Sequence, residues 1–250
     1  MQYGICPLSV VPLRNSPDDN SSMLSQILYG EHFKVLEQRK HWSKIRCALD
    51  HFEGWVLNNQ IILIEQSDYQ NLEDNTAQKN TSDLISFVET NNRELIPIVM
   101  GSSIPNKNIL NHIFEGSCTD VVKEKNKLIQ TALLYLNTPY LNGGRTPFGI
   151  DCAGFTQMVY KINGHKLLRT ALEQSTQGDA LSFIEESEAG DLAFFDDNEG
   201  IINHVGLIME NNYIIHANGK IRIDRIDHTG IFNSETKTYS HKLRVIKQIA

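Results

Sequence analysis

Cys152 is the residue whose surroundings in the sequence most strongly indicate chemistry. It follows Asp151 directly, after the Gly/Pro-rich stretch TPYLNGGRTPFGI (138–150) and at the start of the amphipathic run CAGFTQMVY. Aspartate is a favoured N-cap, because its side-chain oxygen accepts hydrogen bonds from amides of the first helical turn. Cys152 is therefore expected at a helix N-terminus, where the peptide dipoles lower the pKa of a thiol, although the Asp151 carboxylate opposes this in part.

Two histidines are suited to act with this thiol. His204 begins HVGLIM and His216 ends NYIIH, 12 residues later, with MENN as a turn between them. Two antiparallel strands joined in this way bring both rings near the same end of a sheet. His204 can then act as base toward Cys152, while His216 orients the His204 ring and stabilises its charged form. Seven other histidines show no ligand spacing and are interpreted as ordinary: His32, His41, His51, His112, His165, His228 and His241.

The four cysteines do not indicate a metal site. Cys6, Cys47, Cys118 and Cys152 are scattered, without a C-x-x-C pair. We therefore expect no zinc site and no cofactor, and free thiols in a reducing compartment.

Composition limits the partners and the location. The 250 residues carry 23 basic and 30 acidic side chains, a net charge of −7, which disfavours nucleic acid and anionic membranes as partners. The N-terminus lacks a basic start and a continuous apolar core, and Met1 leads directly into a strand-like pattern, which argues against a lost leader. No run of about 18 apolar residues occurs. We therefore expect a cytoplasmic protein, and nothing in the sequence demands more than a monomer.

The predicted elements fall into three segments. Residues 1–65 contain short strands separated by turn signals, which predicts a small β-barrel. Residues 66–120 begin with a polar, turn-rich stretch and continue with strand-like runs, which predicts a linker or a second small β module. Residues 121–250 change from helical spacing to strands (DLAFF, HVGLIM, NYIIHA, KIRIDRI), which predicts an α+β domain.

Four motifs in residues 121–250 resemble those of the NlpC-type cysteine peptidases: TPYLNGGRTPFGIDCAGF, AGDLAFF, NHVGLIM and YIIHA. The resemblance implies a papain-like domain with a Cys-His-His triad, in which Cys152 is the nucleophile, His204 the base and His216 the third member. Tyr140 matches a tyrosine beside the oxyanion site, where the amide of Cys152 is the other donor.

The N-terminal segment resembles a bacterial SH3-like domain, through VPLRNSPDDNSSMLSQILYGEHFKVLE, HWSKIR and EGWV. Family members with such a domain resemble γ-D-glutamyl-L-diamino acid endopeptidases of the dipeptidyl-peptidase VI type. This implies cleavage of small murein-derived peptides that carry a free N-terminal L-Ala, in the recycling of cell-wall peptides. It also implies that Asp151 and an aromatic residue before Gly-Trp contact the free amine.

The sequence departs from this pattern at three positions. Phe52 lacks the phenolic hydroxyl usual before Gly-Trp, Ala153 stands where a serine often follows the nucleophile, and Asn142 replaces a tryptophan. The triad is unaffected, but two polar contacts to the substrate are absent from the pattern. An amidase or acyltransferase on the same fold and a non-catalytic peptide-binding module remain as alternatives, and the sequence does not choose between diaminopimelate and lysine at the scissile bond.

Overall fold

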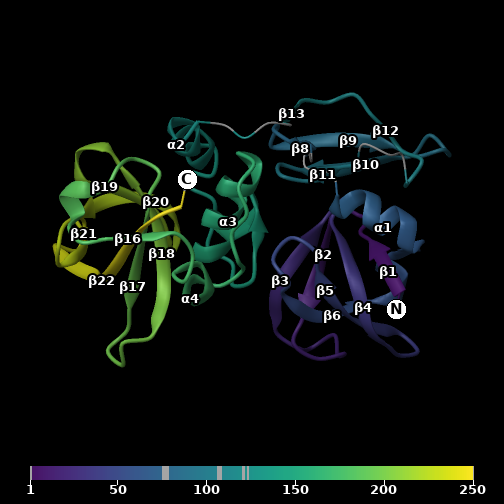
Figure 1. Cartoon of the computed structure of the whole chain (residues 1–250), viewed down its shortest axis with the longest axis horizontal. Coiled ribbons are helices and arrows are strands. Elements are labelled where there is room, and N and C mark those ends of the chain that lie inside the picture. The colour runs from purple at the N-terminus through teal and green to yellow at the C-terminus, as the bar shows by residue number, and fades with distance from the viewer. Residues whose placement is uncertain (1, 75–78, 106–108, 120–121, 123, 250) are drawn as a thin grey trace. The chain divides into compact units, whose positions relative to one another are not determined.

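The computed structural model describes residues 2–74, 79–105, 109–119, 122 and 124–249. The chain divides into two compact units, residues 1–122 and 123–250. Figure 1 shows the elements of both. No helix in the described part of the chain is long and apolar enough to span a membrane.

A seven-stranded antiparallel sheet forms the start of the first unit, as the short strand patterns predict. Its order is β3-β2-β6-β5-β4-β1-β7, and apolar residues such as Val11, Phe33 and Ile45 fill its core. The strands, with the 3-10 helix η1 (Asn58–Gln60), are β1 (Gln2–Ile5), β2 (Val10–Arg14), β3 (Met23–Leu28), β4 (His32–Gln38), β5 (Trp42–Cys47), β6 (Glu53–Leu57) and β7 (Ile62–Ile64).

The polar stretch after residue 65 includes a helix that the sequence did not predict. Helix α1 (Gln66–Glu73) buries Tyr69, whose ring stacks on Tyr3 with centroids 4.4 Å apart. The later strand-like runs do form strands, in two three-stranded sheets of order β10-β9-β12 and β11-β8-β13. These are β8 (Lys79–Thr81), β9 (Ile85–Glu89), β10 (Leu95–Val99), β11 (Ser103–Ile104), β12 (Ile113–Phe114) and β13 (Cys118–Thr119). The three-segment domain division stays a prediction.

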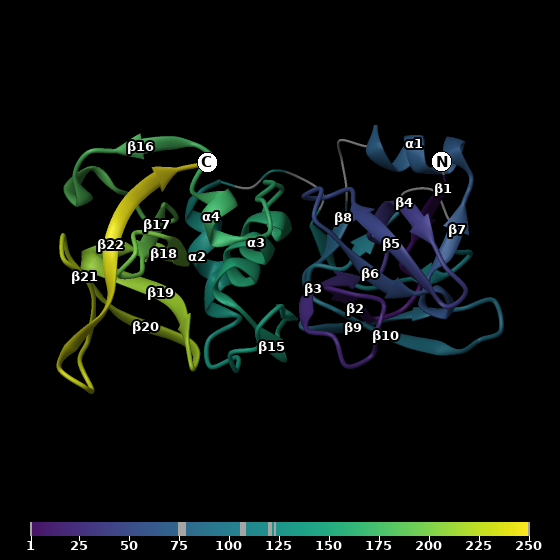
Figure 2. The same ribbon diagram turned by 90° about the horizontal axis from the view of Figure 1, so that it is seen from below.

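The second unit combines helices with a seven-stranded antiparallel sheet of order β16-β22-β17-β18-β19-β20-β21, in which β21 also pairs with β22. Figure 2 shows β22 as a long curved strand of this sheet. The strands are β16 (Asp179–Leu181), β17 (Leu192–Asp196), β18 (Ile202–Met209), β19 (Tyr213–Asn218), β20 (Lys220–Ile226), β21 (Gly230–Asn233) and β22 (Thr238–Gln248). The remaining elements are α2 (Asn126–Leu133), β14 (Arg145–Thr146), β15 (Gly149–Ile150), α3 (Cys152–Ile162), α4 (Ala171–Gln174), η2 (Ile184–Glu186) and η3 (Glu210–Asn212).

Helix α3 begins where the sequence predicts. Asp151 has an extended backbone, and its Oδ1 accepts a 2.6 Å hydrogen bond from the amide of Gly154. Every residue of α3 is buried, so this helix is the centre of the unit. The Asp151 carboxylate also receives the buried Arg169 guanidinium, at 3.1 Å (Nη1–Oδ1) and 2.6 Å (Nη2–Oδ2). The helix start is therefore fixed by a cap and by a bidentate ion pair.

The hairpin of β18 and β19 fixes the face on which the two histidines lie. Its turn, η3, includes Asn211 at φ 59°, in the left-handed region that asparagine tolerates. Gly206 pairs with His216, and His204 lies two residues before Gly206 on β18. Because side chains alternate along a strand, His204 and His216 lie on the same face.

Replacing Arg169 by methionine should destabilise the protein by about 3–5 kcal/mol, because Asp151 would remain buried without its cation. Urea unfolding followed by circular dichroism measures this. The matched control is Arg225→Met. Arg225 is exposed, and its guanidinium carbon lies 4.7 Å from the centre of the Tyr213 ring, so its loss should cost about 1 kcal/mol or less. Equal losses in the two variants would show that the buried pair does not hold the helix start.

Candidate active site

The Cys152 sulfur lies against the backbone that carries His204. Sγ is 3.8 Å from the carbonyl oxygen of Asn203 and also has a backbone hydrogen bond with Val205. These two residues flank His204 in β18, and Cys152 itself is 8% exposed. The structure thus brings the predicted nucleophile to the strand segment of the predicted base.

A relay of hydrogen bonds extends from His204 into the sheet. The Nε2 atom of His204 lies 2.9 Å from Nδ1 of His216, and Nε2 of His216 lies 3.0 Å from Oδ2 of Asp224. Arg222 donates to both Asp224 oxygens, at 2.7 Å from Nε and 3.0 Å from Nη2. The predicted pair of histidines is therefore part of a longer chain that ends in the ion pair of the buried Asp224 with the partly buried Arg222.

This relay assigns the tautomers of both rings. The Asp224 carboxylate can only accept, so Nε2 of His216 carries a proton and Nδ1 of the neutral ring is an acceptor. Nε2 of His204 must then donate to it, which leaves a lone pair on Nδ1 of His204. That nitrogen is the one nearer the strand backbone, where the sulfur lies. His204 is thus held in the form that can take a proton from Cys152.

The electrostatics of the resting site favour neutral groups. Burial, and next the Asp151 charge, raises the pKa of the Cys152 thiol to about 11, so the expectation of a lowered thiol pKa is wrong for this structure. Burial, with His241 and His216 nearby, holds the pKa of His204 well below its usual value. Burial also lowers the pKa of His216, whereas hydrogen bonds from His216 and Arg222 outweigh burial and lower the pKa of Asp224. The thiol and the imidazole are therefore both neutral at rest, and a thiolate has to form by proton transfer from Cys152.

Tyr140 and Ala153 lie close to the sulfur. Tyr140 is 46% exposed, and burial, followed by the charges of Cys152 and Asp151, raises the pKa of its hydroxyl. The Ala153 amide makes a backbone hydrogen bond to the Cys152 sulfur, and its carbonyl accepts from Gln174 Nε2 at 2.9 Å. Both residues are therefore placed where they can affect the nucleophile, and their role toward a substrate stays a prediction.

The Asp151 carboxylate accepts several hydrogen bonds. Besides Gly154 and Arg169, its Oδ2 accepts from the Gly143 amide at 2.8 Å, so four donors fill the four acceptor positions of a carboxylate. The predicted contact with a substrate amine is not tested by these bonds. It does require the amine to displace or share one of these donors.

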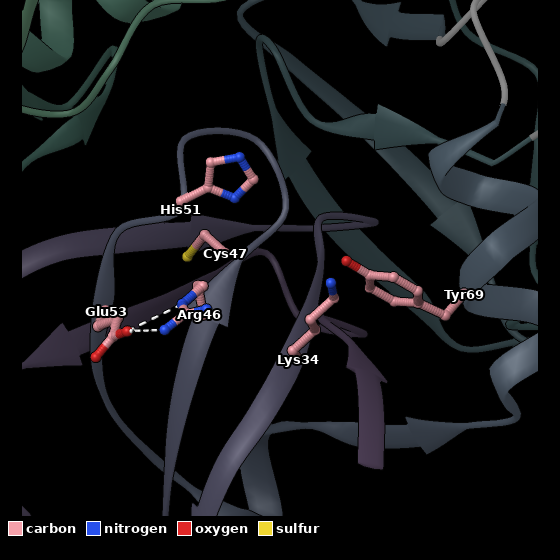
Figure 3. Close-up of a pocket in the computed structure, with 6 residues that line it drawn as sticks. All are labelled: Lys34, Arg46, Cys47, His51, Glu53 and Tyr69. Carbon is pink, nitrogen blue, oxygen red and sulfur yellow. Dashed lines mark hydrogen bonds and ion pairs between the residues drawn. The ribbon is translucent and has the colours of Figure 1, made fainter. Parts of the chain in front are cut away.

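Phe52 belongs to the first unit and packs against the core of that unit. Its two neighbours in sequence, His51 and Glu53, line a cavity of about 500 Å³ (Figure 3). Hydrogen bonds from Lys44 and Arg46 lower the pKa of Glu53. The full lining is Lys34, Arg46, Cys47, His51, Glu53 and Tyr69. The segment before Gly-Trp thus has a charged concave surface beside it, and a contact of Phe52 with substrate stays a prediction.

Two residues of the site were missed in the sequence. Asp224 could have been predicted. The turn at Gly219 pairs Asn218 with Lys220, and this register places residue 224 on the same face of the sheet as His216. His241, interpreted as ordinary, was assigned wrongly: its ring stacks on His204 with centroids 4.0 Å apart and planes 21° apart. No local sequence signal indicates this, since His241 comes from the distant strand β22.

The same three rings form a group of potential metal ligands. One ring nitrogen from each of His204, His216 and His241 lies within 4.8 Å of the other two, the one such group among the described residues. Imidazole nitrogen is a ligand for zinc and other transition metals.

A cysteine at a helix N-terminus, a histidine relay and an antiparallel sheet are features of a papain-like cysteine peptidase site. Comparison with known protein families supports this class. Residues 137–240 match the model of the NlpC/P60 family, and residues 13–61 match the model described as the bacterial dipeptidyl-peptidase Sh3 domain. The second unit therefore carries an NlpC/P60 domain, and the first carries a bacterial SH3-like domain.

Individual relatives cover the chain to different extents. Gamma-D-glutamyl-L-lysine dipeptidyl-peptidase of Bacillus subtilis is 38% identical over 92 residues, which is 36% of this chain and 31% of that protein. Dipeptidyl-peptidase 6 of Lysinibacillus sphaericus is 24% identical over 84% of this chain and 87% of its own length. The crystal structure of an NlpC/P60 family protein from Bacillus cereus covers 98% of this chain and 99% of its own, with a TM-score of 0.80 at 17% identity. That last likeness concerns the fold alone, and the family and the named relatives support a cysteine peptidase.

Replacing Asp224 by asparagine should lower kcat by roughly ten- to a hundredfold, because a hydrogen bond to a charged acceptor is worth about 1.5–3 kcal/mol and stabilises the charged His204–His216 pair. Peptide hydrolysis by the purified variant measures this. Asp227→Asn is the matched control, since Asp227 lies on the turn after β20 and bonds to Thr229, Gly230 and Tyr239 rather than to a histidine. If Asp224→Asn is as active as this control, the relay does not support the base.

Alkylation of Cys152 by iodoacetamide should become about ten times faster for each pH unit between pH 6 and pH 9, because only the thiolate reacts and burial raises the thiol pKa to about 11. Mass spectrometry of the peptide that contains Cys152 gives the rate at each pH. A rate that is constant over this range would mean a thiolate–imidazolium pair in the resting protein, contrary to the neutral site described above.

Proposed function

We propose that this protein is a cysteine endopeptidase that hydrolyses the γ-D-glutamyl–diamino acid bond of cell-wall-derived peptides with a free N-terminal L-Ala. The observation that carries the proposal is the Cys152–His204–His216–Asp224 arrangement. The name of the Bacillus subtilis relative, gamma-D-glutamyl-L-lysine dipeptidyl-peptidase, supports the substrate class. We further propose that it acts in the cytoplasm, as a monomer, on small soluble peptides during murein peptide recycling.

The first half of the reaction makes an acyl-enzyme. Nδ1 of His204 takes the Sγ proton of Cys152 as the sulfur attacks the carbonyl carbon of the γ-D-glutamyl bond. His216, backed by Asp224, stabilises the imidazolium that forms on His204. The tetrahedral intermediate then collapses, and the His204 proton goes to the departing amine of the diamino acid, which leaves a thioester on Cys152.

The second half releases the product. A water molecule loses a proton to His204 and attacks the thioester carbonyl, and the Cys152 sulfur leaves and recovers the proton from His204. In both halves the oxyanion is stabilised by the Cys152 amide at the helix N-terminus and by the Tyr140 hydroxyl. This chemistry requires no metal or organic cofactor.

Recognition of the free amine is proposed for the surroundings of Asp151. Since the Asp151 carboxylate already accepts from Arg169 and two amides, the amine would share its charge rather than find an open carboxylate. A weak discrimination between free and blocked amines is therefore expected. This observation also favours, as the second candidate, an amidase or acyltransferase that uses the same triad.

The test is product analysis by mass spectrometry with L-Ala-γ-D-Glu-L-lysine and L-Ala-γ-D-Glu-diaminopimelate, each with a free and an acetylated amine. Cys152→Ala should lose at least about a thousandfold in kcat, as expected when the nucleophile of a triad is removed. Cys118→Ala, which removes a half-buried thiol in the first unit, should keep full activity. Unchanged turnover by Cys152→Ala would reject the proposal, and transfer to an added amine or equal cleavage of acetylated peptides would favour the second candidate.

A further inference from the structure

We propose that His204, His216 and His241 form a binding site for a transition-metal ion of the Zn²⁺ class, and that the bound ion inactivates the base. The metal-binding part of this proposal rests on the arrangement of the three rings alone. The inhibitory consequence rests on the proposed peptidase function.

The spacing of the three ring nitrogens suits one ion. They lie within 4.8 Å of one another. A tetrahedral Zn²⁺ with Zn–N bonds of 2.0–2.1 Å needs about 3.3 Å between its ligand atoms. The Nε2–Nδ1 distance between His204 and His216 is 2.9 Å, so a small separation of these rings opens the position.

One of the three histidines, His216, already has the outer partner that metal-binding histidines have, and His241 has a candidate partner in its present, stacked position. Such ligands usually hydrogen-bond an oxygen atom through the ring nitrogen that does not bind the metal. Nε2 of His216 bonds to Asp224, which leaves Nδ1 toward the group, and Nδ1 of His241 lies 2.9 Å from Oγ of Ser240. The Asp224 carboxylate also supplies a negative charge close to the ion.

His241 has to turn for the site to close. Its ring is nearly parallel to that of His204, so the lone pairs of the two rings do not converge in the stacked arrangement. His241 is only half-buried, in contrast to the buried His204 and His216, so it is the ring with room to rotate. The three ligands leave a fourth position for water, as in zinc sites with three histidines.

A metal ion here would change the tautomer of His204. Coordination takes the Nε2 lone pair, so the Nε2 proton is lost to solvent and Nδ1 takes up a proton in its place. Nδ1 then points a proton at Cys152 and can no longer accept one. The ion would thus inhibit the enzyme through the proton on Nδ1, without binding the sulfur.

Binding is tested without activity, by calorimetry with Zn²⁺ and by the visible absorption of Co²⁺, on protein that carries Cys152→Ala. We expect one ion per chain, Co²⁺ bands without sulfur charge transfer, and at least tenfold weaker binding when His241→Phe is added. Phenylalanine keeps an aromatic ring against His204 but has no ligand atom. His228→Phe, at an exposed position of the same unit, is the matched control and should bind as before.

His241→Gln is measured alongside, so that the result does not depend on one substitution, and thermal melts of the metal-free proteins identify any variant that fails to fold. Loss of all binding on Cys152→Ala alone would assign the ion to a cysteine–histidine pair and overturn the proposal. Equal affinity in the His241 variants and the His228 control would overturn it as well.

Inhibition is then measured on protein with Cys152 intact. The Zn²⁺ concentration that halves peptide hydrolysis should rise at least tenfold in His241→Phe, each variant being compared with its own metal-free rate. If the protein binds the ion as described but hydrolyses no peptide, the peptidase proposal fails while the metal site stands. If peptide is hydrolysed and Zn²⁺ inhibits both proteins equally, the three-histidine site is rejected.

Discussion

The hydrogen bonds that join Asp224, His216 and His204 are the interaction on which the site depends. A buried carboxylate fixes the proton on one imidazole, which in turn fixes the proton on the next. The result is a neutral His204 ring with its free lone pair on Nδ1, in the strand whose backbone contacts the Cys152 sulfur. None of these groups is reactive alone. The relay keeps His204 neutral with Nδ1 unprotonated, so that this nitrogen can accept the proton of the thiol.

Two aspartate–arginine pairs, one buried and one partly buried, hold both sides of this arrangement. Asp151 and Arg169 fix the helix that carries the sulfur, and Asp224 and Arg222 fix the strand end of the relay. Buried ion pairs contribute little net stability compared with apolar residues of similar size, but losing one partner is costly. In this protein they serve to position the two halves of the site, since each aspartate also makes the hydrogen bond that orients a catalytic element.

Much of the site could be predicted because it depends on local rules. The N-cap at Asp151 and the turn between the two histidines are encoded within a few residues, and both are present in the structure. The raised pKa of Cys152 could not be read from the helix start, because burial by distant residues outweighs the local dipole. Helix α1 was missed since a polar stretch with one buried tyrosine has a weak apolar pattern.

His241 shows the limit of such reasoning. Its strand, β22, pairs with β17 and β21 across irregular registers at Phe194/Phe195 and Ile231/Phe232. Each shift of one residue reverses the face on which a side chain lies, so sequence alone cannot assign His241 to the His204 face. Asp224, in contrast, follows a regular hairpin and was within reach.

The protonation state of the His204 ring is the most direct test of the hydrogen-bond relay. In protein labelled with ¹⁵N-histidine, two-bond ¹H–¹⁵N correlation spectra at neutral pH distinguish the two neutral tautomers and the imidazolium. This relay predicts that His204 and His216 are both neutral with the proton on Nε2, and that His204 is no longer uniformly in this tautomer in Asp224→Asn. A His204 ring protonated on Nδ1, or an imidazolium at neutral pH, would contradict it.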